Sequence, residues 1–254
     1  MRFSPPNPKR SLLVILGASS FVNAPGLAAG AAFFNSMSRV RNYLNSANGL
    51  GIDRANILEL FDDDRPAGSQ LDDIIGFLST RQQSGQALEP AENLFVYYVG
   101  HGLFTRDRKY CLAVRRTNEG NVGFSAIRGS DLADVIRVNA IHLRRFLILD
   151  CCFAASMSRE FLSASGEAAT TQLLEELPER GTSLLCASSS QDVALAPRDL
   201  ECTMFSDALL KALERGSPAL GPRMSLADLG ALVRNILRSD YPSSWVRPDR
   251  KSVV

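Results

Sequence analysis

The chain has 254 residues, of which 45% are hydrophobic and 22% are charged, and its formal net charge is +1. This length and composition are enough for the buried core of one large soluble domain or two small ones. A net charge so close to zero, with the arginines scattered along the chain, argues against a nucleic-acid or membrane-surface partner. No apolar run approaches the roughly 20 residues that a membrane helix needs.

The cysteines and histidines limit the metal and redox chemistry. Five cysteines, two of them adjacent, suit neither a disulfide framework nor a CxxC zinc site. Two histidines far apart complete no tetrahedral zinc set, which argues against a zinc hydrolase. We therefore expect reduced thiols, no bound metal and a cytoplasmic protein whose polar N-terminus is not a secretory leader.

The first part of the chain alternates apolar runs with amphipathic stretches. Residues 11–17 (SLLVILG) predict a fully buried parallel strand, and residues 28–50 carry the apolar stripe of a helix. A second strand is expected at 56–61, followed by a helix capped by Ser69 and a third strand at 94–99.

The alternation continues to the end of the chain. Further strands are expected at 110–114, 145–150 and 181–188, and further helices at 132–138 (capped by Ser130 or Asp131), 205–213 and 226–237. This pattern predicts a single α/β domain over residues 1–254, a three-layer sandwich with a mostly parallel central sheet flanked by helices. We expect a flexible arm at 1–10, a polar, weakly helical segment at 156–180 and an irregular tail at 240–254.

Two of the predicted strands are each followed by a side chain with nucleophile or base chemistry. His101 comes just after the run 95–99 and is flanked by glycines, and Cys152 comes just after the run 146–149. Functional groups of parallel sheets gather at the carboxyl ends of the strands. A thiol and an imidazole at one such edge predict a cysteine nucleophile with its base, and hence acyl transfer.

Non-catalytic roles are the alternative for these residues. His101 is alternatively a solvated loop histidine, whereas His142, which lies among arginines, is interpreted as a surface residue. Cys151 and Cys152 are adjacent, so in a strand they point to opposite sides of the sheet. One of them is expected in the core and the other in the cleft.

The sequences YYVGHG (97–102) and LDCCFA (149–154) resemble the His and Cys motifs of caspase-like cysteine peptidases, nearest to the metacaspase-related and bacterial caspase-like group. His101 and Cys152 are 51 residues apart, which agrees with a caspase spacing of about 50. The apoptotic signature QAC(R/Q/G)G is absent. The resemblance covers nearly the whole chain and implies the caspase-haemoglobinase fold.

The resemblance implies catalytic roles for particular residues. Cys152 would be the nucleophile, His101 would protonate the leaving amine, and the backbone N–H groups of Gly102 and Cys152 would form the oxyanion hole. Where the metacaspase pattern has a His-Ser-Gly type of sequence, this chain has Phe-Ala-Ala at 153–155. That departure keeps open a catalytically impaired scaffold or binding module.

The same resemblance predicts substrate specificity. Asp150 would form an acidic S1 pocket, with Asp192 as a second charge, and cleavage would follow Arg, with Lys second. A structural cap or turn is the alternative role for Asp150. The substrate would be a protein or peptide, and the peptidase would be controlled by a regulatory or sensor partner in bacterial signalling or defence.

Processing and cofactors are the remaining questions. The segment 156–180 stands where the family carries its inter-subunit linker, which makes Arg159 and Arg180 candidate self-cleavage sites. No cofactor is expected. Calcium activation is implied by family analogy only, because the acidic turn 62–64 lacks the EF-hand spacing.

A nucleotide-binding function would use the residues that follow the first strand. Residues 17–20 (GASS) lack both the GxGxxG pattern and the GKS or GKT of a phosphate-binding loop. This reading is therefore much weaker than the peptidase.

Overall fold

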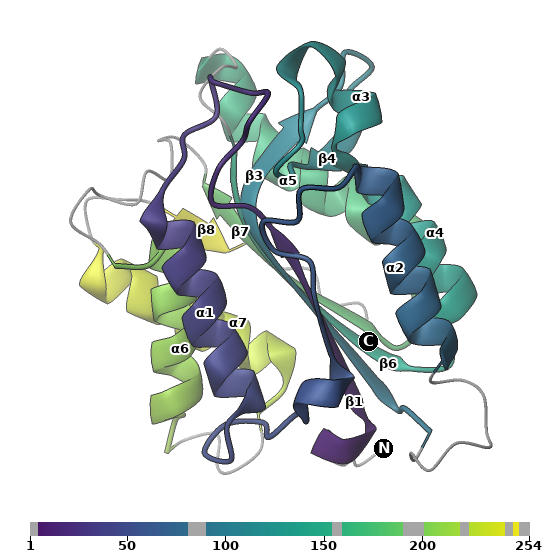
Figure 1. Ribbon diagram of the computed structural model, residues 1–254. Coiled ribbons are helices and arrows are strands. Elements are labelled where there is room, and N and C mark those ends of the chain that lie inside the picture. Colours follow the sequence, from purple (N-terminus) through teal and green to yellow (C-terminus); the bar gives the residue numbers. More distant parts are fainter. Residues whose placement is uncertain are drawn as a thin grey trace.

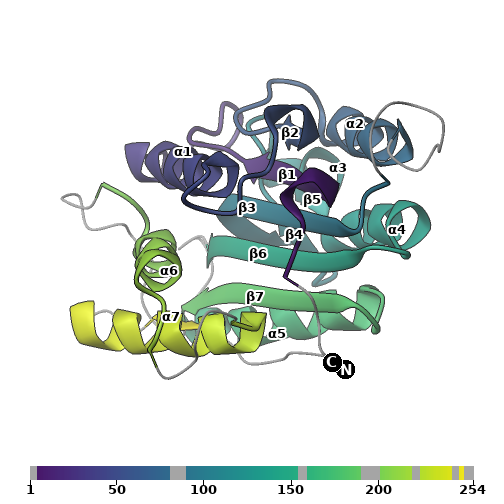
Figure 2. The same cartoon turned by 90° about the horizontal axis from the view of Figure 1, so that it is seen from below.

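The computed structural model describes residues 5–80, 90–153, 159–189, 201–218, 224–241 and 246–248. Its centre is an eight-stranded sheet in the order β2-β1-β3-β6-β7-β8, with β4 paired to β3 and β5 paired to β4. The strands are β1 (Ser11–Gly17), β2 (Ile57–Glu59), β3 (Asn93–Phe104), β4 (Tyr110–Leu112), β5 (Ile127–Arg128), β6 (Arg144–Phe153), β7 (Thr182–Ser189) and β8 (Val246–Pro248). Strands β2, β1, β3, β6 and β7 run parallel. Figure 2 shows β1, β3, β6 and β7 in this order across the sheet.

Helices cover both faces of the sheet. They are α1 (Ala31–Asn45), α2 (Ala67–Thr80), α3 (Val122–Ser125), α4 (Gly129–Asn139), α5 (Arg159–Glu176), α6 (Met204–Arg215) and α7 (Leu226–Asp240). Helices α1, α6 and α7 pack on one face, and α2, α4 and α5 pack on the other (Figure 1). The predicted three-layer α/β sandwich is confirmed.

Strand β1 shows why its sequence is continuously apolar. Leu13 and Ile15 belong to the core under α1, α6 and α7, whereas Leu12, Val14 and Leu16 belong to the core under α2, α4 and α5. Successive side chains of a strand point to opposite faces, so a strand covered by helices on both sides needs an apolar residue at every position.

The predicted helix starts were less accurate than the helices themselves. Helix α2 begins at Ala67, so Ser69 lies inside it and does not cap it. The N-cap of α4 is Arg128, not Ser130 or Asp131. Ser225 does cap α7, in a reciprocal arrangement with Asp228.

The segment 156–180, predicted to be polar and weakly helical, is largely a helix. Helix α5 has 18 residues, and Ala169, Leu173 and Leu177 are buried at or just beyond its C-terminal half. These side chains pack in the core with those of α2 and α4. The apolar stripe of this stretch is weak, so its sequence predicts a helix only weakly. Tertiary packing stabilises the helix.

The predicted arm 1–10 and the predicted tail 240–254 each contain a short regular element. Residues Pro8–Arg10 form a short 3₁₀ helix, and Arg10 donates to the carbonyl of Pro90 at 2.9 Å and pairs with Glu92. Near the C-terminus, β8 pairs antiparallel with β7 and so extends the sheet. Among the described residues, no helix combines the length and the apolar character needed to span a membrane.

The amino-terminal edge of the sheet contains a buried arginine. Arg145, near the start of β6, is 1% exposed, and burial lowers the pKa of its guanidinium. The group donates to the carbonyls of Ala140, Ile141, Leu143 and Arg180 and to the hydroxyl of Thr182. Arg145 therefore joins the α4–β6 turn to the α5–β7 turn.

Candidate active site

The pairing of β3 with β6 brings the two predicted motifs side by side. The strands are parallel, and the Cα of His101 is the register partner of the Cα of Cys152. Gly100 pairs in the same way with Cys151. Both motifs therefore lie at the carboxyl ends of neighbouring strands, where parallel sheets build their sites.

The imidazole of His101 is held on three sides. The residue is only 4% exposed, and its ring centroid lies 5.1 Å from that of Phe21 and 5.2 Å from that of Phe33. Its Nε2 lies 2.8 Å from the carbonyl oxygen of Ala28. Because a carbonyl only accepts, Nε2 must carry a proton, and Nδ1 is then the basic nitrogen of the neutral ring. This environment excludes a solvated loop histidine.

Sequence reasoning could not identify this carbonyl. Every residue has a backbone C=O, so Ala28 has no side-chain signature that a motif search can find. Phe33 belongs to the apolar stripe of the predicted helix 28–50, whereas Phe21 precedes that helix and has no predicted role. Their role depends on the path of the chain after β1.

Gly100 is required by close packing beneath the strand. A Cβ at this position would lie 2.7 Å from the hydroxyl of Tyr98. That hydroxyl is within 2.8 Å of the carbonyl of His101 and 2.9 Å of the carbonyl of Ala113, and it donates to them. The chain makes no sharp turn at this glycine, because β3 continues to Phe104.

The side chain of Cys151 lies in the core, whereas that of Cys152 is not among those described. Cys151 is 3% exposed, belongs to the core under α2, α4 and α5, and accepts a hydrogen bond from the Tyr110 hydroxyl at 3.0 Å. A buried thiol in an apolar core is expected to be unreactive.

Asp150 has a different environment from the one that the sequence predicted. It is 1% exposed, and its Oδ2 accepts hydrogen bonds from the hydroxyls of Ser206, at 2.5 Å, and Thr203. Burial raises the pKa of this carboxyl to about 6, although both hydrogen bonds oppose the shift. Thr203 is the N-cap of α6, so the carboxylate also lies at the positive end of that helix.

These contacts are those of a structural residue that ties β6 to α6. They favour the structural alternative for Asp150 over direct contact with a substrate. The second predicted specificity residue, Asp192, lies outside the described residues.

One of the two candidate self-cleavage sites, Arg180, lies at the opposite end of the sheet from His101. Arg180 is exposed at the amino-terminal edge of the sheet, beside Arg145, whereas Cys152 lies at the other end of the same strand β6. Seven residues of strand span more than about 20 Å, so a molecule folded in this way cannot cleave its own Arg180. Self-cleavage at Arg180 stays a prediction, and in this fold it would need a second molecule. Arg159 is the first residue of α5, and its side chain is not among those described.

The acidic turn after β2 is paired with arginines. Asp63 contacts Arg65 at 2.5 Å, and Asp64 contacts Arg116 at 3.0 Å. Carboxylates neutralised in this way do not fit a calcium site, which needs several oxygen ligands aimed at one point. In the described part of the chain, no group of three or more acidic, histidine or cysteine side chains is arranged to hold a metal.

The third carboxylate of that turn, Asp62, binds the loop 17–20, which is the candidate nucleotide site. Its Oδ1 accepts the backbone N–H of Ser19 at 2.7 Å, and its Oδ2 accepts the Ser19 hydroxyl at 2.6 Å. The donors that would bind a phosphate are thus already bound to the protein's own carboxylate, which argues against nucleotide binding.

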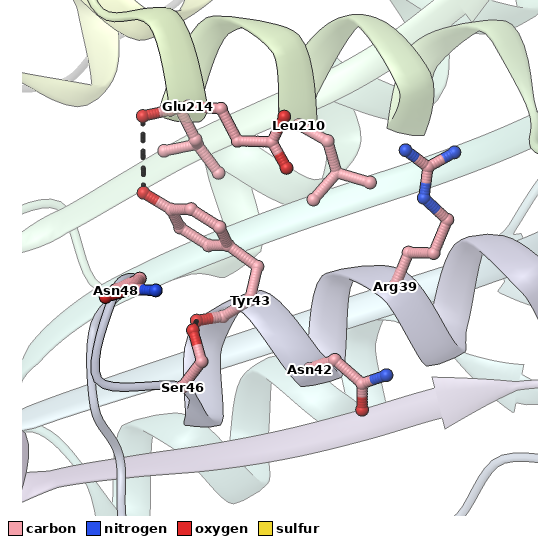
Figure 3. Close-up of a pocket in the computed structure, with 8 residues that line it drawn as sticks. Arg39, Asn42, Tyr43, Ser46, Asn48, Leu210 and Glu214 are labelled. Carbon is pink, nitrogen blue, oxygen red and sulfur yellow. Dashed lines mark hydrogen bonds between the residues drawn. The ribbon is translucent and has the colours of Figure 1, made fainter.

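A separate open groove of about 530 Å³ lies between α1 and α6 (Figure 3). It is lined by Arg39, Asn42, Tyr43, Ser46, Asn48, Leu210, Leu213 and Glu214. The hydroxyl of Tyr43 crosses it to donate to the carbonyl of Leu213 at 3.3 Å. The groove contains none of the residues around His101.

A family model for the caspase domain matches residues 35–251 of the chain. The chain belongs to the caspase family. Among solved structures, this caspase domain resembles caspase-1 from Spodoptera frugiperda, with a TM-score of 0.60 and 11% identity over 97% of this chain and 86% of that one. It also resembles the protein GSU0716 from Geobacter sulfurreducens, with a TM-score of 0.58 and 12% identity over 96% and 93% of the two chains.

At such low identity these likenesses establish the fold alone. No curated protein matches the sequence of this caspase domain. Membership of the family supports a caspase-like cysteine peptidase in general.

Proposed function

We propose that this caspase domain is a cysteine endopeptidase in which Cys152 is the nucleophile and His101 is its acid–base partner. The observation that carries the proposal is the β3–β6 register, which pairs these two residues. Cys151 belongs to the core of one face, so the alternation of the strand assigns position 152 to the opposite face. His101 packs against Phe21 and Phe33, which belong to the core of that opposite face.

The chemistry follows from these positions. The thiolate of Cys152 attacks the scissile carbonyl carbon, and the negative charge moves to the carbonyl oxygen. The backbone N–H groups of Gly102 and Cys152 would stabilise that oxyanion by about 3 kcal/mol each. His101, which took the proton of the Cys152 thiol as the thiolate formed, then gives it to the leaving amine as the C–N bond breaks. His101 next takes a proton from the water that attacks the thioester, and this proton restores the thiol as the acid is released. The Ala28 carbonyl keeps the imidazole oriented throughout.

We propose cleavage after Arg, with Lys second. Support comes from Asp150, two residues before the nucleophile, whose pKa of about 6 leaves it ionised at neutral pH. As a buried carboxylate it would act by its charge, because charges in the interior are poorly screened, and not by contact with the substrate. Asp192 would supply a second negative charge to the same pocket.

Covalent labelling tests the nucleophile. A peptide chloromethylketone with arginine at P1 should label the wild-type protein and the Cys151→Ala variant but not the Cys152→Ala variant. Labelling that survives in Cys152→Ala would remove Cys152 as the nucleophile. No labelling and no peptide hydrolysis by the wild type would favour the alternative, a catalytically impaired scaffold.

A peptide panel tests the specificity. Turnover should be fastest with arginine at P1, slower with lysine and slowest with aspartate. Asp150→Asn should weaken the preference for arginine over a neutral residue. Faster turnover of the aspartate peptide by the wild type would refute the acidic pocket.

A further inference from the structure

The segment that follows β1, residues 18–30, forms the wall around His101. It supplies the Ala28 carbonyl that accepts from the imidazole and the Phe21 ring that packs on it. We call it the His101 wall. The orientation of His101 therefore depends on how firmly this segment is held.

The His101 wall is a closed loop with one strong attachment near its start. The N–H of Gly30 donates to the carbonyl of Ser19 at 3.0 Å, so the two ends of the loop are joined. Both hydrogen-bond donors of Ser19 are in turn bound by Asp62, and the N–H of Asp62 donates to the carbonyl of Gly17 at 3.0 Å. Hydrogen bonds to a charged acceptor are about twice as strong as neutral ones.

The backbone of Asp62 supports a specific role for this residue. Its φ is 56°, in the left-handed region, which is uncommon for residues other than glycine and which Asp and Asn enter more readily than the others. Such conformations persist where the surroundings compensate for them, and they cluster at functional sites. Here the compensation is the set of hydrogen bonds with Gly17 and Ser19.

We propose that Asp62 is a positioning residue for His101, acting through the His101 wall. The path of contacts runs from Asp62 to Ser19, across the loop closure to Gly30, and from there to the carbonyl of Ala28. Asp62 touches neither His101 nor a substrate in this scheme. The inference rests on the proposed peptidase function, since it assigns a residue that maintains the same site.

The charged neighbour of Asp62 contributes a second support. The Nη1 of Arg115 lies 3.9 Å from Asp62 and donates to the hydroxyl of Ser20 at 2.7 Å. The carbonyl of Arg115 also accepts from the N–H of Val22 at 3.0 Å. The wall is thus bound on one side by Asp62 and on the other by Arg115.

Two substitutions separate the hydrogen bonds from the backbone strain and the charge. Asp62→Gly removes both hydrogen bonds to Ser19 and at the same time relieves the strain of a positive φ. Asp62→Asn keeps an acceptor for the Ser19 N–H, while its NH₂ group can donate to the Ser19 hydroxyl, so only the charge is lost. Asp63→Asn is the matched control, because Asp63 carries the same charge and pairs with Arg65.

In steady-state hydrolysis of an arginyl peptide, Asp62→Gly should lower kcat by about 10-fold or more with KM within about threefold, because it misplaces a catalytic group without removing a substrate contact. Alkylation of Cys152 by iodoacetamide should slow, with Cys152→Ala as background, since a mispositioned imidazole stabilises less thiolate. A purely structural loosening would expose the thiol and speed this reaction. Asp62→Asn and Asp63→Asn should remain near the wild type in both measurements.

Hydrogen exchange keeps the inference testable if the wild type proves inactive. The amides of residues 19–30 should exchange faster in Asp62→Gly than in Asp62→Asn, whereas exchange in β1 should be unchanged. Equal exchange in the two variants would overturn the inference whatever the activity. So would wild-type kcat in Asp62→Gly, or an Asp62→Asn variant as impaired as Asp62→Gly. An inactive wild type with the predicted exchange pattern would instead contradict the proposed function alone.

Discussion

The two edges of the sheet each bury an ionisable side chain, but in different ways. At the amino-terminal edge, the guanidinium of Arg145 donates to four carbonyls and one hydroxyl. At the carboxyl edge, His101 lies between two aromatic rings, with one nitrogen on the carbonyl of Ala28. In the first arrangement, the hydrogen bonds of the guanidinium hold two turns together. The second fixes the orientation and tautomer of a ring.

The difference separates burial for stability from burial for chemistry. A guanidinium bound to so many acceptors links segments of chain and cannot exchange a proton, because its pKa stays far above neutrality. An imidazole has an unperturbed pKa near neutrality, so it can exchange a proton while its ring is fixed in orientation. Arg145 should therefore affect stability, and His101 should affect activity.

The largest expected effect is on activity, from His101→Ala. Loss of the acid–base group should lower kcat/KM for the arginyl peptide by about 10²–10⁴-fold. Thermal unfolding provides the control, since the folded fraction at the assay temperature should stay close to that of the wild type. Retention of more than a tenth of the activity would break the contrast between the two edges.

Arg145→Met should produce the reverse pattern. The substitution leaves buried carbonyls without a donor, at a cost of roughly 1–3 kcal/mol for each group that water cannot reach, so we expect a loss of about 3 kcal/mol or more in the free energy of unfolding. Urea titration measures it. Arg145→Lys restores a cation with fewer donors and should be intermediate. Lost activity at unchanged stability would contradict the structural role.

Asp150 gives a pH-dependent test at the active-site edge. Burial raises the pKa of Asp150 from 3.8 to about 6, so the folded protein binds this proton more tightly than the unfolded chain does. The resulting stability is fully present below about pH 4 and is lost as the pH rises through about 6. Relative to Asp150→Asn, the wild type should lose about 2 kcal/mol between pH 4 and pH 7. Parallel curves from urea titrations across this range would show that the carboxyl is not the cause.

The smallest expected effect calibrates the others. Ser225→Ala removes the N-cap of α7, whose hydroxyl accepts from the N–H of Asp228 at 3.1 Å, and should cost about 1 kcal/mol with unchanged turnover. Ser239→Ala, at the far end of the same helix, is the control and should change the free energy of unfolding by less than about 0.5 kcal/mol. A change in turnover from Ser225→Ala would mean that stability and activity are not separable here.

Sequence patterns alone predicted the mostly parallel sheet and the edge of it at which His101 and Cys152 lie. Apolar runs such as residues 11–17 are continuous because both faces of the strand are covered, and this pattern is local to each strand. The glycine-flanked His101 and the adjacent cysteines follow such runs. The sequence alone therefore predicted that they lie near the carboxyl ends of strands. In the structure, β3 pairs with β6 in a register that places His101 beside Cys152.

The groups that surround His101 and Asp150 at that edge are known only from the folded structure, because they come from distant parts of the chain. The Ala28 carbonyl, the attachment of Ser19 to Asp62 and the burial of Asp150 under α6 all join positions 43 or more residues apart. A backbone carbonyl has no residue-type signature, and an aspartate has the same sequence appearance in a pocket, a turn or a helix cap. Burial and partners, which exist only after the chain has folded, distinguish these roles.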